Sequence, residues 1–112
     1  MNSGLFGHPS NLSAQDKFSI VRSPIICLLR RQNIFPNNHY SIVYNVQTTL
    51  VLPSITRPGD IIWISNNSNI FTHVVARNGK RINQANEDLI LDVPDRIVCL
   101  RYVNDSIGWL VT

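Results

Sequence analysis

Beyond residue 39, apolar residues recur in short runs that are separated by clusters of proline, glycine, asparagine and serine. The runs are rich in β-branched and aromatic residues, which favour strands, while the clusters favour turns. The runs cover residues 40–46, 48–52, 61–65, 72–77, 80–83, 89–93, 96–103 and 107–111. Short strands that recur about every ten residues are typical of a sandwich or a barrel. We therefore predict an all-β fold, a compact antiparallel β-sandwich or barrel-like domain.

Asn78 and Gly79 lie between two of these runs, residues 72–77 and 80–83. A type I′ turn needs positive φ at both of its central residues, and Asn-Gly tolerates that conformation best. The pair therefore predicts a two-residue hairpin turn at Asn78 and Gly79, with the flanking runs paired as strands. The chain then re-enters a sheet after a short polar segment.

Several runs are apolar on both faces rather than on one, namely residues 50–52, 61–64 and 97–100. A lone antiparallel domain of this size normally leaves one face of each sheet wet, so that its strands alternate. The double-sided pattern indicates either the inner strands of an ordinary two-layer sandwich or burial against neighbouring subunits. In the second case the expected interface residues are Ile62, Ile64, Val98 and Leu100.

The first 39 residues lack this regular pattern. Residues 1–16 have the composition of a loop, and residues 18–35 are strand-like, with an initial alternation followed by a short apolar run. The proline and two asparagines at positions 36–38 favour a turn and terminate strand pairing, so they mark a boundary. We therefore divide the chain into an extended N-terminal arm, residues 1–39, and a β-domain, residues 40–112.

The arm is both apolar and basic. Residues 1–35 hold four basic residues and one acidic residue, whereas residues 36–112 hold six of each, so the formal net charge of +3 belongs to the arm. Burying a large apolar side chain is worth about 1.5–3 kcal/mol, so we expect the arm to lie against a partner. Its expected docking residues are Phe6, Phe18, Arg22, Ile25, Ile26, Leu28, Leu29, Arg30 and Arg31.

The longest apolar stretch of the arm, residues 24–29, is far shorter than the roughly twenty residues that a membrane span requires. The start of the chain has no basic segment of the kind that opens a signal peptide. We therefore expect no membrane span and a protein that is made in a cytoplasm. Cys27 and Cys99 are too few for a metal site, and they either act as small apolar residues or form a disulfide.

No pattern in the sequence argues for catalysis. His8, His39 and His73 stand in no motif that brings them beside a nucleophile, and Glu87 and Asp88 would point to opposite faces of a strand. Phosphate-binding, zinc-protease and hydrolase motifs are missing. We expect no enzyme activity, no metal and no cofactor.

Nucleic-acid binding is a rival interpretation. Arg77, Lys80 and Arg81 cluster on the expected hairpin and could contact phosphates, with nearby aromatic residues stacking on bases. Three charges on a hairpin are more often a solvated face, and acidic residues follow closely along the chain. We therefore expect no nucleic-acid partner.

Glycan binding is a further alternative, because asparagine side chains and aromatic rings hydrogen-bond and stack on sugars. Its candidate contact residues are Trp63, Asn67, Asn69 and Trp109. The asparagines also suit β-turns for backbone reasons alone, and that interpretation stays open beside the first. Loops on a rigid β scaffold are nonetheless where recognition residues are often found.

Four motifs occur in one order along residues 40–112. They are Pro58-Gly59-Asp60 before an apolar strand, Arg77-Asn78-Gly79 at a turn, Glu87-Asp88-Leu89 at the start of a strand, and a closing Tyr102 and Trp109. In this order they resemble a small β-domain of bacteriophage tail-fibre and related virion proteins. Residues 1–39 lie outside the resemblance.

The resemblance implies a structural protein of a virion, made in the host cytoplasm. Domains of that family assemble as threefold fibres or knobs, so it implies a homotrimer whose other partners are virion proteins. The arm would dock the trimer onto the tail, the baseplate or a fibre. The alternatives are a capsid decoration protein and a module that binds a host-surface glycan.

Overall fold

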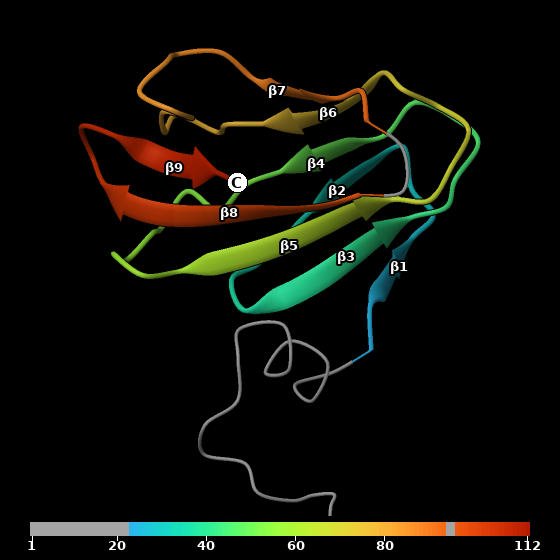
Figure 1. The fold of residues 1–112 in the computed structure, drawn as a ribbon, viewed down its shortest axis with the longest axis horizontal. Coiled ribbons are helices and arrows are strands. Elements are labelled where there is room, and N and C mark those ends of the chain that lie inside the picture. The colour runs from blue at the N-terminus through green and yellow to red at the C-terminus, as the bar shows by residue number, and fades with distance from the viewer. Residues whose placement is uncertain (1–22, 94–95) are drawn as a thin grey trace, which may run out of the picture.

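The computed structural model describes residues 23–93 and 96–112, and this part of the chain is all-β, with nine strands and no helix. The strands are β1 (Ile25–Cys27), β2 (Arg31–Asn33), β3 (Asn38–Ile42), β4 (Thr49–Val51), β5 (Ile61–Asn66), β6 (His73–Ala76), β7 (Leu89–Leu91), β8 (Ile97–Asn104) and β9 (Gly108–Val111). They form two sheets that face each other in two layers (Figure 1). The all-β, two-layer part of the prediction is confirmed.

Successive strands in the first part of the chain alternate between the two layers. The five-stranded sheet has the order β1-β3-β5-β8-β9 and the four-stranded sheet the order β2-β4-β6-β7. Strands β1, β3 and β5 are parallel, with Tyr40 paired to Ile25 on one side and to Ile64 on the other. Strands β2, β4 and β6 are likewise parallel. The chain therefore coils through both sheets, one turn of the coil stacking on the next.

The last third of the chain reverses this pattern. Strand β7 runs antiparallel to β6, β8 antiparallel to β5, and β9 antiparallel to β8. The expectation of an antiparallel sandwich is therefore wrong for the first six strands, and the sheets are not closed into a barrel. The physical reason is that each strand crosses to the opposite layer before the chain returns, which makes its neighbours parallel.

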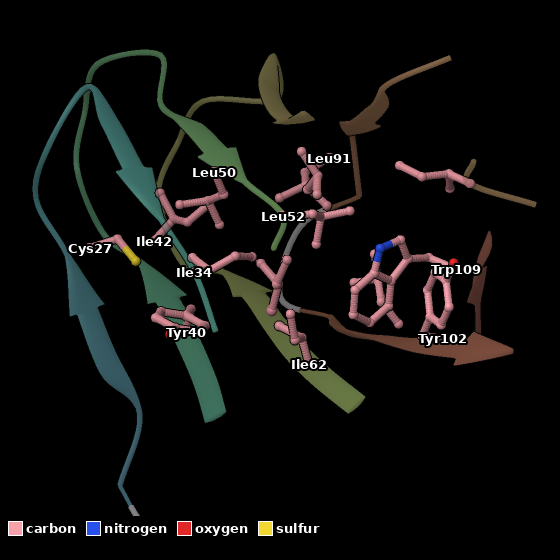
Figure 2. Close-up of a cluster of buried hydrophobic side chains, with 14 residues drawn as sticks. Cys27, Ile34, Tyr40, Ile42, Leu50, Leu52, Ile62, Leu91, Tyr102 and Trp109 are labelled. Atoms are coloured by element: carbon pink, nitrogen blue, oxygen red, sulfur yellow. The ribbon is translucent and has the colours of Figure 1, made fainter. Parts of the chain in front are cut away.

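The core lies between the two layers. Ile42 and Ile62 from the five-stranded sheet and Leu50 from the other lie in this core (Figure 2). Leu100 and Val75 belong to it as well, and none of these five side chains has exposed surface. At one end of the core Trp109 packs edge-on against Tyr102, with ring centroids 5.3 Å apart and an interplanar angle of 73°. Burial of such side chains stabilises the fold by about 1.5–3 kcal/mol each.

The first strands belong to the fold rather than to a separate arm. Residues 25–33 form β1 and β2, which pair with β3 and β4, and Cys27 and Ile34 have no exposed surface. The expected boundary at residues 36–38 is the turn between β2 and β3, where Asn37 has a φ of 66°. The part of the arm that holds Phe6, Phe18 and Arg22 lies outside the described residues.

The turn at Asn78 and Gly79 is confirmed, but the hairpin is wrong. Both residues have positive φ, 51° and 87°, and the amide of Lys80 donates to the carbonyl of Arg77 at 3.1 Å. The partner of β6 is nevertheless β7, and residues 81–83 run beside β9 instead. A second tight turn causes this, because Asn83 and Gln84 also have positive φ, 50° and 67°.

Candidate functional site

A chain of polar side chains closes the corner where β5 crosses to β6. His73 has no exposed surface, and its Nδ1 accepts a hydrogen bond from the amide of Thr48 at 2.9 Å. Its Nε2 therefore carries the proton and donates to Ser68 Oγ at 2.7 Å, and that hydroxyl donates to Asn66 Oδ1 at 2.7 Å. Burial lowers the pKa of His73, which keeps the ring neutral. The histidine thus holds two stacked turns of the coil together.

A second polar row lies on the outward side of the five-stranded sheet. His39 Nε2 and Ser65 Oγ are 2.9 Å apart, and Asn67 Oδ1 accepts from Ser65 Oγ at 2.9 Å and from Ser41 Oγ at 2.7 Å. These hydrogen bonds link β3 to β5. Burial lowers the pKa of His39 as well. Both histidines are therefore used within the fold.

The residues expected to contact a glycan separate into two groups. Trp63 and Asn67 share the outward side of the five-stranded sheet, and Asn69 is exposed in the turn that follows. Trp109 has no exposed surface, so its proposed contact with a ligand is wrong. The structure assigns Trp109 to the core, where it closes one end of the space between the layers (Figure 2).

The residues expected at an interface between subunits point into the core. Ile62, Ile64 and Leu100 have no exposed surface, and Val98 is partly buried against the same cluster. The sandwich interpretation of these runs therefore accounts for all four side chains. The alternation of the strands turns the neighbours of these residues outward.

The outward neighbours form an apolar surface, which we call the outer face. Strand register places Trp63 beside Cys99 and aligns Ile61 with Arg101, and Arg101 in turn pairs with Leu110. Ile97 and Leu110 are 42% and 38% exposed, while Ile61, Trp63 and Cys99 are half-buried. The sequence signal for this surface was the double-sided apolar pattern, which correctly required apolar residues on the outside as well.

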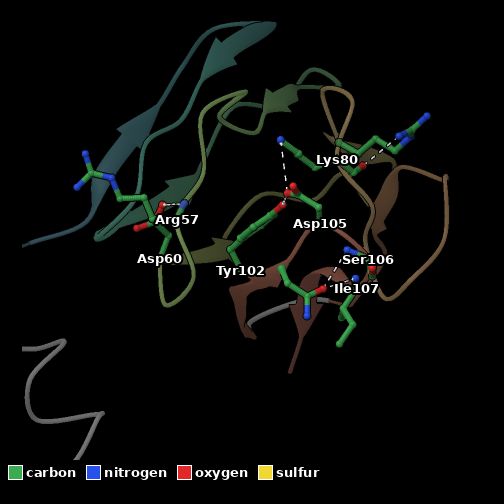
Figure 3. Close-up of polar contacts among 9 residues, drawn as sticks. Arg57, Asp60, Lys80, Tyr102, Asp105, Ser106 and Ile107 are labelled. Atoms are coloured by element: carbon green, nitrogen blue, oxygen red, sulfur yellow. Dashed lines mark hydrogen bonds and ion pairs between the residues drawn. The ribbon is translucent and has the colours of Figure 1, made fainter.

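The basic side chains at and after the Asn78-Gly79 turn form their contacts with other groups of the same chain. Arg77 donates through its guanidinium to the carbonyl of Lys80 at 3.0 Å, and Arg81 donates to the carbonyl of Ser106 at 3.1 Å. Lys80 Nζ lies 3.9 Å from the carboxylate of Asp105, which also accepts a hydrogen bond from Tyr102 (Figure 3). These contacts satisfy the cluster locally, which fits the interpretation of a solvated face.

The six docking residues of the arm that the structure describes gather at the first turn of the coil. Ile25 and Ile26 belong to β1, Leu28 and Leu29 to the crossing that follows, and Arg31 to β2, with Arg30 just before it. The four apolar residues are 37–59% exposed. These residues form an exposed apolar and basic surface, and several of them belong to strands of the fold.

The pockets of the described residues include two of modest size. One of about 170 Å³ opens between β7 and β8 and is lined mainly by apolar side chains, among them Ile64, Leu89, Ile90 and Val111. Across residues 23–93 and 96–112, no group of three or more histidine, cysteine or acidic residues could hold a metal ion. Both cysteines are free thiols in the structure.

No protein-family model matches the chain, and no curated protein matches it. The described part of the chain contains no helix that is long and apolar enough to cross a membrane.

Proposed function

We propose that this protein is a small structural component of a bacteriophage virion that works as a homotrimer and joins the tail, the baseplate or a fibre through its N-terminal region. A capsid decoration protein is the alternative within the same class. The proposed role is mechanical rather than catalytic. The protein would be made in the host cytoplasm and would act in the assembled virion. Other virion proteins are its expected partners.

The outer face is the observation that carries the proposal. Its apolar side chains lie on the five-stranded sheet, on the side away from the core that the two layers already share. Exposed apolar side chains such as Ile97 and Leu110 favour an interaction site on this face, where they lie beside the exposed Arg101. A threefold assembly would bury three such faces against one another, as the resemblance to fibre domains implies.

The residues that carry the resemblance also support a rigid structural part. Gly59, with a φ of 94°, and Asp60, which accepts from the amide of Arg57 at 2.9 Å, form a tight turn before β5 (Figure 3). Asn78 and Gly79 form a second turn, and Trp109 closes the core. These positions serve the scaffold, which is the use that a virion protein would make of them.

The mass of the full chain in solution tests the proposal. Light scattering after size exclusion should give three times the chain mass of 12.7 kDa. Ile97→Asp places a charge on the outer face at a position that is 42% exposed, so the fold should persist while the trimer dissociates. The matched control is Ile90→Asp on β7, where the side chain is 47% exposed and belongs to the other sheet.

A full chain that remains a monomer at every accessible concentration would remove the main support for this function. Equal dissociation by both aspartate variants would show that the outer face is not the interface. Circular dichroism of each variant establishes that it remains folded.

A further inference from the structure

The two ends of the five-stranded sheet are built differently, whereas the four-stranded sheet has an edge strand on each side, β2 and β7. At the end formed by the last strands, β9 is covered by residues 81–83, whose Arg81 carbonyl accepts from the amide of Trp109 at 2.8 Å and whose Asn83 amide donates to the carbonyl of Trp109 at 2.7 Å. At the other end both β1 and β2 are edge strands, one in each sheet (Figure 1). Within the described residues, no strand pairs with their outer edges. We call this surface, formed by residues 25–35, the open end.

The core itself is unfinished at the open end. Ile25, Tyr40 and Ile64 lie in one inward row across three paired strands. Their exposed fractions are 37%, 2% and 0% in that order, so burial is complete on the second and third turns of the coil but not on the first. On the other layer Gln32, paired with the fully buried Leu50, is only half-buried. A strand added beside β1 would cover Ile25, and a strand added beside β2 would cover Gln32.

Backbone groups at the open end are oriented to receive such a strand. In β2 the carbonyl of Arg30 accepts from the amide of Thr49 at 2.8 Å, and the amide of Ile34 donates to the carbonyl of Val51 at 3.0 Å. In a parallel pair, alternate residues direct their backbone groups to the same side. Arg31 and Asn33, which lie between the bonded positions, therefore direct theirs away from β4. Extended peptides add to sheets at edges of this kind.

Charge and hydrophobicity at the open end define the partner. Leu28, Leu29 and Phe35 are 57%, 59% and 58% exposed and flank β2. The described sequence from residue 23 to residue 59 holds Arg30, Arg31 and Arg57 and no acidic residue. A second copy that presented its own open end would bring its own arginines, and one that presented its opposite end could offer only β7, the three-residue edge of its four-stranded sheet, because β9 is covered. An acidic and apolar strand of a different chain suits it better.

We propose that the open end binds an extended segment of a partner protein, which adds as a strand along β2 and alternates apolar residues on its inward side with acidic residues on its outward side. The inward side chains cover the row that ends at Gln32, and an outward carboxylate lies across from Arg31. Opposite charges paired across strands contribute about 0.2–1 kcal/mol each. This inference rests on the proposed function, because it names the surface through which the protein joins a larger assembly.

A short synthetic peptide in which valine alternates with glutamate is the probe, and its binding to the full chain is followed by fluorescence anisotropy. The matched peptide alternates valine with lysine. We expect saturable binding of the glutamate peptide, at least about tenfold tighter than that of the lysine peptide. In the chain with Arg30→Glu and Arg31→Glu together, this preference should reverse. Arg96→Glu, at an exposed arginine that precedes β8, is the control and should leave it unchanged.

Amide hydrogen exchange locates the bound strand. The amides of Arg31 and Asn33 should exchange freely in the protein alone and become protected when the glutamate peptide binds. Methylation of alternate backbone nitrogens of the peptide should abolish both binding and protection, because a strand docks through those groups. Failure of the peptide to bind, or equal binding of both peptides, would overturn the proposal.

Protection of the Arg31 and Asn33 amides before any peptide is added would also overturn it, since the edge would then be occupied within the protein itself. These results are independent of the trimer test. The chain mass reports on the outer face, and peptide binding reports on the open end. If the protein is a trimer but does not bind the glutamate peptide, only the inference about the open end is refuted.

Discussion

The α-carbon of Gly108 lies directly against the carbonyl group of Arg81. A side chain at position 108 would overlap the carbonyl carbon and oxygen of Arg81, and the φ of Gly108, 76°, belongs to the left-handed region that glycine adopts most readily. The same carbonyl accepts the amide of Trp109 at 2.8 Å. This contact fastens the segment after the Asn78-Gly79 turn onto β9 and so joins one layer to the other.

Gly108→Ala is expected to be strongly destabilising, because Arg81 must move and its hydrogen bond to Trp109 must weaken. Gly79→Ala is the control, since Gly79 also has positive φ, 87°, but no atom within 4 Å of the added methyl group. Left-handed strain alone costs about 1–2 kcal/mol. Urea unfolding should show an additional loss of about 2 kcal/mol or more for the Gly108 variant. Equal losses in both variants would mean that the contact with Arg81 contributes nothing.

The sequence predicted the strands better than their partners. The run at residues 89–93 contains β7 and the run at residues 61–65 covers all of β5 but its last residue, because β-branched residues and flanking turns are local signals. Pairing is not local. Tyr40 lies between Ile25 and Ile64 in the sheet, and no feature of those three residues specifies that the intervening chain crosses to the other layer and returns.

For the exposed surfaces too, the sequence predicted which segments are apolar better than it predicted the face on which each side chain lies. Exposed apolar residues were expected near residues 25–29 and on strands with two apolar faces, and the structure has both. Which face is outward depends on register, and Ile62 and Leu100, the candidates for an interface between subunits, lie inside. The role of Trp109 in the core depends on its contact with Tyr102 across β8 and β9, which the spacing of the two residues alone does not specify.

Acid should destabilise the fold through its two buried histidines. Burial lowers the pKa of His73 and of His39 from the ordinary value of 6.5. Just below that value the two histidines therefore bind protons in the unfolded chain but not in the folded chain. Stability contributed by these groups is complete above that value and is lost as pH falls below it toward the folded pKa. Each histidine can add a slope of at most about 1.4 kcal/mol per pH unit.

Urea unfolding measured between pH 8 and about pH 5.5, where carboxylates still contribute little, checks this. His73→Gln and His39→Gln should each reduce the slope, and the double variant should reduce it further. A pH-independent free energy of unfolding in the unsubstituted chain would contradict the prediction. It would mean that the Thr48 amide does not need a neutral His73 as its acceptor.

The two cysteines should differ in reactivity and should not form a disulfide. Cys27 has no exposed surface, and burial raises the pKa of its thiol to about 11, whereas Cys99 is half-buried on the outer face. Strands β3 and β5 separate β1 from β8 in the sheet. Iodoacetamide at pH 8 should therefore label Cys99 much faster than Cys27 in the folded Ile97→Asp variant, whose outer face is not covered by other copies. Both thiols should react in urea without a reductant, and a chain that needs reduction first would contradict this assignment.

Trp109 should act on stability and not on recognition. Its ring fills the end of the core beside Tyr102 and has no exposed surface, so Trp109→Ala removes a large buried side chain and should cost about 3–5 kcal/mol. Trp109→Phe keeps part of the contact and should cost less. Trp63→Ala is the comparison, because Trp63 is half-buried on the outer face and its loss should shift the urea midpoint less. Circular dichroism gives the midpoints, and a Trp109→Ala chain that unfolds at the original midpoint would mean that the ring does not hold the layers together.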